Sequence, residues 1–217
     1  MQTKAKIPHS SNPPSAWVRR FAPLIRRGGL VLDLAAGSGR HSRFLLDRGF
    51  VVCLVDRDIS ALLPLAGARC EVRQIDLETG APWSLGGGYD GIVVTNYLHR
   101  PLFPALATAL APEGIIIYET FAIGNERFGR PSNPDFLLRP GELLDVFREL
   151  TVIAFEQGEV SRPRPAVIQR IAAIAGPLGH LPKITGSTNL DSNRATRALG
   201  RAPRGTTAAY REHVKRR

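Results

Sequence analysis

A glycine-rich turn with an acid before it is the first part of this 217-residue sequence whose residue types and spacing indicate chemistry. The stretch LDLAAGSGRH places Asp33, Ala35, Gly37 and Gly39 in the pattern D-x-A-x-G-x-G. Glycine allows a tight turn and lets a ligand approach the backbone closely. An acid in the first position, where a dinucleotide fingerprint has glycine, disfavours a pyrophosphate and favours a ligand with a positively charged amino group. We expect Gly37 and Gly39 to form the tight turn, whereas Ala35 need only be small.

Two more acids end the next two apolar segments. Asp56 closes FVVCLVD, where a carboxylate can accept hydrogen bonds from ribose hydroxyls. Asp76 and Leu77 end the following segment, where a carboxylate can pair with an exocyclic amine while the leucine packs on an aromatic base. A ligand that combines an ammonium group, a ribose and an aminopurine is S-adenosylmethionine.

Parallel strands are needed to bring these residues to one edge. Short apolar runs alternate with segments of helical periodicity, and this alternation predicts an α/β doubly wound, mostly parallel sheet. The predicted strands are 30–35, 50–56, 70–76, 89–98, 114–121, 151–160 and 166–175. The predicted helices are 15–27, 40–48, 59–66, 103–111 and 141–150, the third of them weak because Pro64 interrupts it.

The segments VLDLAAGSGRH, LVDRD and the Asp-Leu pair at 76–77 resemble class I S-adenosylmethionine-dependent methyltransferases over about residues 14–175. The resemblance implies a Rossmann-like, seven-stranded sheet with a reversed last hairpin. It is closest to the small, single-domain bacterial enzymes of the tellurite-resistance type, which act on small molecules. The family usually has glycine where Ala35 stands. The cofactor-binding set implied by the resemblance and the spacing is Asp33, Ala35, Gly37, Gly39, Asp56, Asp76, Leu77 and Asn96.

The methyl acceptor is expected near the ends of the fourth and fifth strands. Here TNYLHR resembles, without matching, the Asn-Pro-Pro-aromatic motif of amine methyltransferases that act on bases or glutamine. His99 is a candidate general base or only part of the structure, and Tyr97 either faces the methyl group or packs. Glu119 is the third catalytic candidate. No residue is obliged to act as acid or base when the acceptor is already a nucleophile, so none is assigned.

Residues 122–140 form the candidate acceptor loop, because long loops in compact domains tend to be functional. Arg127, Arg130 and Asn133 are its predicted substrate-binding residues, in a lid that closes over an anionic acceptor. The alternative is a solvated connection in which charged residues pair at the surface.

The net charge of +10 lies mostly at the C-terminal end. Residues 171–217 hold 9 Lys and Arg against 2 Asp and Glu, and residues 1–170 hold 20 against 17. The sequence predicts a flexible N-terminus (1–13), a methyltransferase domain (14–176) and a basic, flexible tail (177–217). A small-molecule methyltransferase is the first hypothesis. An RNA methyltransferase that uses the tail and a non-catalytic cofactor-binding module are the alternatives.

Membrane and metal functions find no support in the sequence. No apolar stretch is long enough to span a bilayer, and the first residues have no secretory signal. Cys53 and Cys70 are expected to be reduced thiols in the core, and the five histidines lack metal-ligand spacing. We therefore expect a cytoplasmic protein without a structural metal.

Overall fold

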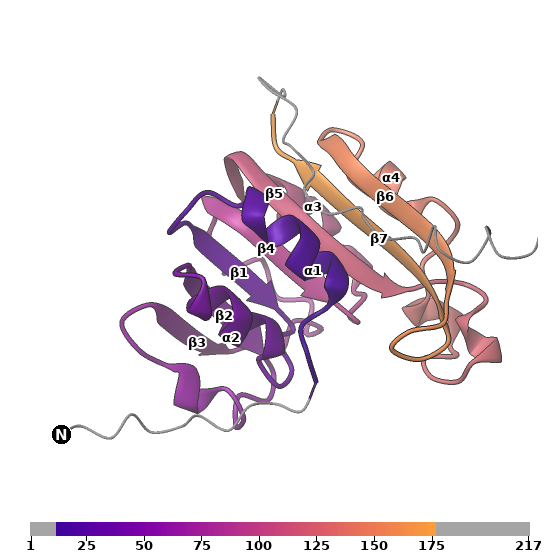
Figure 1. Cartoon of the computed structure of the whole chain (residues 1–217), viewed down its shortest axis with the longest axis horizontal. Helices are drawn as coiled ribbons and strands as arrows, with labels where there is room; N and C mark the ends of the chain where they lie inside the picture. The colour runs from indigo at the N-terminus through magenta and orange to yellow at the C-terminus, as the bar shows by residue number, and fades with distance from the viewer. Residues whose placement is uncertain (1–11, 177–217) are drawn as a thin grey trace, which may run out of the picture. The chain divides into compact units, whose positions relative to one another are not determined.

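A seven-stranded sheet forms the centre of the protein in a computed structural model, which describes residues 12–176 (Figure 1). The strand order is β3-β2-β1-β4-β5-β7-β6; the first five strands run parallel, and β7 is antiparallel to both β5 and β6. This arrangement confirms the predicted fold class and the reversed last hairpin. The strands are β1 (Leu30–Leu34), β2 (Val51–Asp56), β3 (Cys70–Gln74), β4 (Tyr89–Thr95), β5 (Leu110–Phe121), β6 (Thr151–Val160) and β7 (Ala166–Ile174).

Helices cover both faces of the sheet, which is why the central strands are apolar along their whole length. On one face α1 and α2 pack through Trp17, Phe21 and Leu45, and on the other face α3 and α4 pack through Leu106 and Leu143. The helices are α1 (Ala16–Phe21), α2 (Arg40–Asp47), α3 (Phe103–Thr108) and α4 (Glu142–Val146). Short 3₁₀ turns are η1 (Ala22–Leu24), η2 (Leu63–Leu65), η3 (Arg100–Leu102), η4 (Asn125–Arg127) and η5 (Pro134–Phe136).

Helix lengths are where the sequence predictions were wrong. The helix predicted over 15–27 ends at Phe21 and tightens into η1 at Pro23, and the one predicted over 59–66 is reduced to η2. The helix predicted over 141–150 has only five residues. β5 begins at Leu110 rather than 114, because Leu110 pairs with Tyr89 at the start of β4. Pairing in the sheet overrides local helical propensity there.

Several strands end earlier than predicted, and this moves residues of interest into loops. β1 ends at Leu34, so Ala35 follows the strand. β3 ends at Gln74, so Asp76 and Leu77 follow the strand. β4 ends at Thr95, because Asn96 takes a left-handed backbone conformation with φ of 55°.

The described residues are nearly neutral, with 18 Lys and Arg against 17 Asp and Glu in residues 12–176. The basic tail predicted over 177–217, like most of the predicted flexible N-terminus, lies outside the described residues. Within them, no helix is long and apolar enough to cross a membrane, and no group of three or more metal-ligating side chains occurs. Cys53 and Cys70 are buried, free thiols, as predicted.

Candidate functional site

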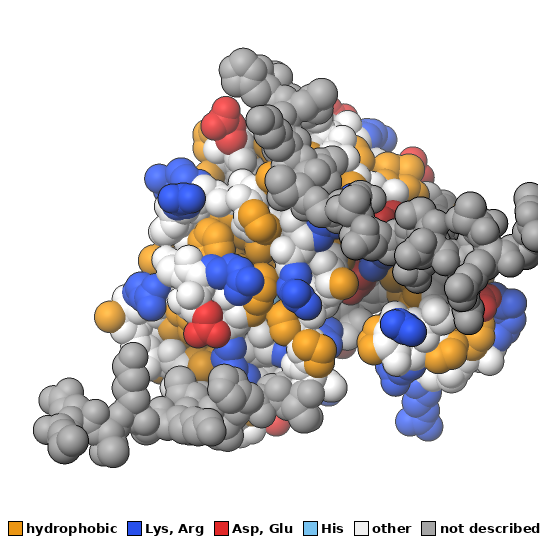
Figure 2. Space-filling view, viewed as in Figure 1, with side chains coloured by type: hydrophobic (Ala, Val, Ile, Leu, Met, Phe, Trp, Pro, Cys, Tyr) orange, Lys and Arg blue, Asp and Glu red, His pale blue; other side chains and the backbone are white. Residues whose placement is uncertain are grey.

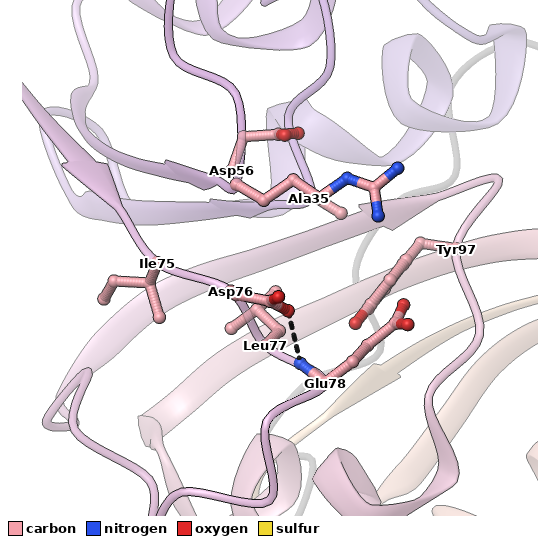
Figure 3. A pocket seen from close by; sticks show the side chains of 8 residues that line it. Ala35, Asp56, Ile75, Asp76, Leu77, Glu78 and Tyr97 are labelled. Carbon is pink, nitrogen blue, oxygen red and sulfur yellow. Dashed lines mark hydrogen bonds between the residues drawn. The ribbon is translucent and has the colours of Figure 1, made fainter.

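A cavity of about 290 Å³ opens at the carboxyl ends of β1, β2, β3 and β4 (Figure 3). The fold brings together four residues of the predicted cofactor set there, namely Ala35, Asp56, Asp76 and Leu77. Open parallel sheets bind ligands at this edge, where the chain turns from each strand towards the next helix. The lining residues are Ala35, Asp56, Arg57, Ile75, Asp76, Leu77, Glu78 and Tyr97.

The glycine-rich turn between β1 and α2 has three left-handed residues. Ala35 has φ of 53°, Gly37 of 57° and Gly39 of 73°. A Cβ at Gly39 would lie 2.8 Å from Leu62 and 2.9 Å from Leu65, whereas a Cβ at Gly37 would project into open space. The expectation that Ala35 need only be small was therefore incomplete, because its position also demands a backbone conformation that favours glycine.

Replacing Ala35 by glycine is expected to leave the free energy of unfolding unchanged or to raise it by up to about 1 kcal/mol. Relief of the left-handed conformation, worth about 1–2 kcal/mol, is offset by the greater freedom of glycine in the unfolded chain. Ala35→Val should instead destabilise the fold and fill part of the cavity. Urea unfolding of both variants checks this; a destabilised Ala35→Gly protein would contradict it.

Asp56 connects the end of β2 to the glycine-rich turn. Its Oδ2 accepts a hydrogen bond from the Gly37 N–H at 2.7 Å, and its Oδ1 accepts one from the Asp58 N–H at 3.0 Å. A carboxylate has about four acceptor positions. Asp56 therefore keeps capacity for ligand hydroxyls while it holds the turn in place.

Asp33 lies beneath the turn rather than in the cavity. Its carboxylate is 1% exposed and accepts a 2.5 Å hydrogen bond from the Ser42 hydroxyl in α2. Burial raises the pKa of Asp33 to about 6, against the smaller opposing effect of the Ser42 bond. The Asp33 carboxylate thus does not line the cavity, where the sequence analysis expected it to contact a ligand ammonium group.

The buried position of Asp33 gives a pH prediction. Its pKa is raised in the folded state, so between about pH 4 and pH 6 the folded protein binds more protons there than the unfolded chain. The contribution of Asp33 to the free energy of unfolding is therefore largest below about pH 4 and is lost as the pH rises through about 6. Asp33→Asn should gain stability relative to the natural protein as the pH rises from 4.5 to 7. Unfolding curves at both values measure this difference; a difference independent of pH would contradict the assignment.

The base of the cavity is formed by the loop after β3. Asp76 Oδ1 accepts a hydrogen bond from the Glu78 N–H at 2.9 Å, and Ile75 and Leu77 supply apolar surface (Figure 3). The sequence analysis did not identify Glu78. Three carboxylates and one guanidinium, that of Arg57, line this cavity, so it favours cationic or donor-rich ligands over phosphates.

The segment after β4 carries Asn96, Tyr97 and His99. The Asn96 N–H donates to the Glu119 carbonyl at 2.9 Å, and the Tyr118 hydroxyl donates to the Tyr97 carbonyl at 2.8 Å. These bonds hold the Tyr97 backbone at the mouth of the cavity. The Asn96 and His99 side chains do not line the cavity, and the His99 ring has no hydrogen-bond partner among residues 12–176.

Glu119 is already engaged by two partners. It accepts a hydrogen bond from the Ser15 hydroxyl at 2.7 Å and pairs with Arg170 at 3.0 Å, and its side chain is 14% exposed. His41, which the sequence analysis missed, joins the same network: its Nε2 accepts from the Ser15 N–H at 3.2 Å, and its Nδ1 lies 3.3 Å from the Thr95 hydroxyl. Burial, followed by the charge of Arg40, lowers the pKa of His41 to about 3. The network joins α1, α2, β4 and β5, so its residues hold these elements together.

The predicted acceptor loop lies beside the β6–β7 hairpin, where the Asn125 side chain accepts a hydrogen bond from the Val167 N–H (Figure 1). None of its residues lines the cavity. Arg127 is exposed, donates to the Gly124 carbonyl and pairs with Glu159 at 3.5 Å. Arg130 is exposed, and the Asn133 side chain accepts from the Asp135 N–H at the start of η5. Arg127 thus has the surface pairing of the alternative interpretation and Asn133 has a turn role, whereas Arg130 is only exposed.

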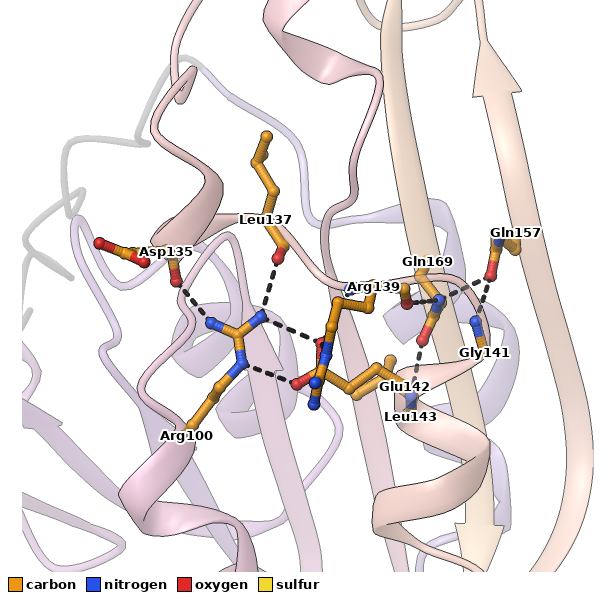
Figure 4. Close-up of polar contacts among 9 residues, drawn as sticks. All are labelled: Arg100, Asp135, Leu137, Arg139, Gly141, Glu142, Leu143, Gln157 and Gln169. Atoms are coloured by element: carbon orange, nitrogen blue, oxygen red, sulfur yellow. Dashed lines mark hydrogen bonds and ion pairs between the residues drawn. The ribbon is translucent and has the colours of Figure 1, made fainter.

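A buried ion pair fixes the end of this loop (Figure 4). Arg100 forms two hydrogen bonds to Glu142, of 2.7 and 3.0 Å, and donates to the carbonyls of Asp135 and Leu137 at 2.7 and 2.8 Å. Glu142 is only 4% exposed. Burial is the largest single effect and acts to raise the pKa of Glu142, but the hydrogen bonds and charge of Arg100, together with the hydrogen bonds from Arg139, outweigh it and hold that pKa below its usual range. Arg100 therefore ties the loop to the segment that carries Tyr97.

Two glutamines also hold the segment at the start of α4. The Gln169 Oε1 accepts from the Leu143 N–H at 2.6 Å, and the Gln157 Oε1 accepts from the Gly141 N–H at 2.8 Å and from the Gln169 amide at 2.7 Å (Figure 4). They satisfy backbone donors at the start of α4 that the helix leaves free.

On the face that carries α1 and α2, Lys and Arg side chains occur in separate places among apolar and uncharged groups (Figure 2). The described side chains visible on that face form no continuous basic groove of the kind a nucleic-acid backbone requires.

The sheet order, the antiparallel β7 and the glycine-rich turn after β1 together define the Rossmann-like fold of class I S-adenosylmethionine-dependent methyltransferases. No protein-family model matches the sequence, and no curated protein matches it.

Solved structures share the fold at low sequence identity. The 1,6-didemethyltoxoflavin-N1-methyltransferase of Burkholderia thailandensis, solved with 1,6-didemethyltoxoflavin and S-adenosylhomocysteine, is 20% identical with a TM-score of 0.57, over 75% of this chain and 77% of that one. TehB from Haemophilus influenzae is 18% identical with a TM-score of 0.58, over 71% of this chain and 60% of that one. The [4+2]-cyclase SpnF is 13% identical with a TM-score of 0.55, over 73% of this chain and 78% of that one. The same fold thus occurs in an N1-methyltransferase and in a [4+2]-cyclase.

Proposed function

We propose that this protein is an S-adenosylmethionine-dependent methyltransferase that acts on a small-molecule acceptor. The observation that carries the proposal is the cavity, which combines two strand-end carboxylates, an apolar wall and a tight glycine turn at the ligand-binding edge of this fold. The open space beside Gly37 and the hydroxyl of Tyr97 at the cavity fit a ligand with polar groups. When bound, S-adenosylmethionine supplies an electrophilic methyl group on a sulfonium.

Different residues of the cavity bind different parts of the cofactor. Asp56 accepts hydrogen bonds from the ribose hydroxyls, Asp76 accepts from the exocyclic amine, and Ile75 and Leu77 pack on the base. The cavity holds the cofactor in one orientation, so that the protein needs only to align the acceptor with the methyl group and to exclude water from it. His99 is our candidate general base for an acceptor that must lose a proton. Arg127, Arg130 and Asn133 are the candidates for contacts with the acceptor.

A small-molecule acceptor is favoured over RNA by the charge of the described residues. Residues 12–176 carry one net positive charge, and the described side chains visible in Figure 2 form no basic groove. The neighbour from Burkholderia thailandensis carries 1,6-didemethyltoxoflavin, a small molecule, in its structure. The RNA hypothesis depends on the tail, and the non-catalytic hypothesis keeps the same cavity.

Two measurements together separate these hypotheses. Calorimetry with S-adenosylmethionine, S-adenosylhomocysteine and NADH tests the cofactor, and methyl transfer from labelled cofactor to fractionated metabolites and to total RNA tests the acceptor. We expect both adenosyl compounds to bind and a metabolite fraction to be labelled. Binding of NADH alone would overturn the proposal. Labelling of RNA alone would select the second hypothesis, and cofactor binding without any transfer would select the third.

A further inference from the structure

Phe136 carries the most exposed aromatic ring in residues 12–176, because 48% of this residue is in solvent. Within these residues, no aromatic ring and no guanidinium stacks on it. The other exposed phenylalanine of the loop, Phe128, is 39% exposed, and the Arg127 guanidinium lies 5.3 Å from the centroid of its ring. Phe136 therefore presents an aromatic face that no ring or cation of the described chain covers.

The backbone that carries Phe136 is held by hydrogen bonds on both sides. At the start of η5, the Asn133 side chain accepts from the Asp135 N–H at 3.0 Å, and the Asn133 carbonyl accepts from the Phe136 N–H at 3.0 Å. The Arg100 guanidinium donates to the two flanking carbonyls, those of Asp135 and Leu137, at 2.7 and 2.8 Å (Figure 4). Leu137 is 1% exposed and anchors the turn. An exposed ring is thus held on a rigid turn.

A solvated connection between two elements does not need this construction. Arg100 is itself held by Glu142, whose side chain is only 4% exposed. A buried ion pair adds little net stability over apolar residues of the same volume, and it can instead serve to fix one geometry. The geometry that this pair fixes is the position of η5, and with it the position of the Phe136 backbone.

η5 lies at the same edge of the sheet as the cavity. β4 and β5 are parallel neighbours, so their carboxyl ends lie together. The N–H of Leu138, two residues after Phe136, donates at 3.0 Å to the carbonyl of Phe121, the last residue of β5. Arg100 belongs to η3 after β4, and Tyr97 of the same segment lines the cavity. A molecule bound against η5 would therefore lie at the edge that holds the proposed cofactor.

We propose that Phe136 is the stacking surface for a planar aromatic methyl acceptor. This rests on the proposed function and assigns a chemical class to the acceptor. Because η5 is rigid, a planar molecule can stack on the ring with little loss of conformational freedom in the protein, and a stacked aromatic pair gains more than its buried area alone. His99 directly precedes Arg100, so our candidate general base belongs to the segment that holds η5.

The test uses 2-naphthol and its saturated counterpart, decahydro-2-naphthol, as probes. Each is titrated by calorimetry into the full chain with saturating S-adenosylhomocysteine. The two probes share a carbon skeleton and a hydroxyl, and only 2-naphthol is planar and aromatic. The natural protein is expected to bind 2-naphthol about 2- to 12-fold more tightly, which is the gain of an aromatic pair beyond its buried area. Phe136→Leu keeps apolar area but removes the ring, so it should abolish this preference. Phe136→Tyr should retain it.

Phe128→Leu is the matched control, because Phe128 is an exposed ring of the same loop that Arg127 already covers. It should leave the preference for 2-naphthol unchanged. Neither Phe128 nor Phe136 lines the cavity, so all three variants should bind S-adenosylhomocysteine as the natural protein does. An equal loss of preference in Phe128→Leu and Phe136→Leu would contradict the assignment to Phe136.

A second measurement does not depend on the probes. The metabolite that is labelled in the methyl-transfer assay should absorb in the near ultraviolet, as aromatic compounds do, and a labelled product without aromatic absorbance would overturn the inference. If S-adenosylhomocysteine binds and the natural protein does not prefer 2-naphthol, or if Phe136→Leu keeps the preference, the inference is overturned while the proposed function stands. If S-adenosylhomocysteine does not bind at all, both are overturned.

Discussion

Replacing Arg100 by alanine is expected to lower the free energy of unfolding by about 2–4 kcal/mol. The substitution takes the two-pronged guanidinium partner from the buried Glu142 carboxylate and leaves it only the more distant Arg139 at 3.5 Å; breaking such a pair typically costs about 3–5 kcal/mol when both partners are fully buried. We reduce that value because the Arg100 side chain is 33% exposed. The two carbonyls that Arg100 binds, those of Asp135 and Leu137, lose a donor as well. Urea unfolding measures the loss.

The controls for this prediction use the same residue type. Arg148 is 77% exposed and pairs only with its neighbour Glu149, so Arg148→Ala should change stability by less than about 0.5 kcal/mol. Arg100→Lys should recover part of the loss, because lysine keeps the charge and lacks the two-pronged geometry. Equal stability of Arg100→Ala and Arg148→Ala would show that the ion pair does not hold the loop.

Replacing Asp56 by alanine is expected to weaken S-adenosylhomocysteine binding by about 1.5–3 kcal/mol, the loss typical of hydrogen bonds to a charged group. Two effects act together: the ligand loses an acceptor, and the glycine-rich turn loses the bond from the Gly37 N–H. Calorimetry measures the affinity, and S-adenosylmethionine should be weakened to the same degree.

Asp58→Ala is the matched control for Asp56→Ala. Asp58 is an exposed carboxylate two residues further along, it accepts hydrogen bonds from Ser60, and it does not line the cavity. Its replacement should leave the affinity unchanged. Equal affinities of the two variants would remove Asp56 from the binding site.

The folded state of Asp56→Ala is informative in its own right. The Asp56 carboxylate joins the end of β2 to the turn after β1, so the loss of binding should be accompanied by greater mobility of the turn. Faster amide hydrogen exchange at Gly37 in the variant without ligand would identify this contribution. Exchange at the natural rate would assign the whole loss of affinity to the ligand contact.

The sequence by itself determined the sheet and which strand-end residues meet at its edge. Apolar runs that end in acids fix where parallel strands stop, and the local pattern of small residues after Asp33 fixes the turn. Because the carboxyl ends of parallel strands meet at one edge, Asp56, Asp76 and Leu77 were predictable as neighbours from their places in the order of strands. The lengths of the helices were not predictable, because pairing and proline restrict them more than their periodicity indicates.

The tertiary structure alone decided which side chains meet across long separations. Arg100 and Glu142 are 42 residues apart, and no local pattern marks them as partners. The same holds for Ser15 and Glu119. The Ser15 hydroxyl donates a hydrogen bond to Glu119, a residue that the sequence analysis considered as a catalytic candidate. Such contacts depend on the register and packing of whole elements, so one sequence read along its length carries no signal for them. The exposed ring of Phe136 belongs to this class, because only the packed chain shows that a large apolar side chain has been left in solvent.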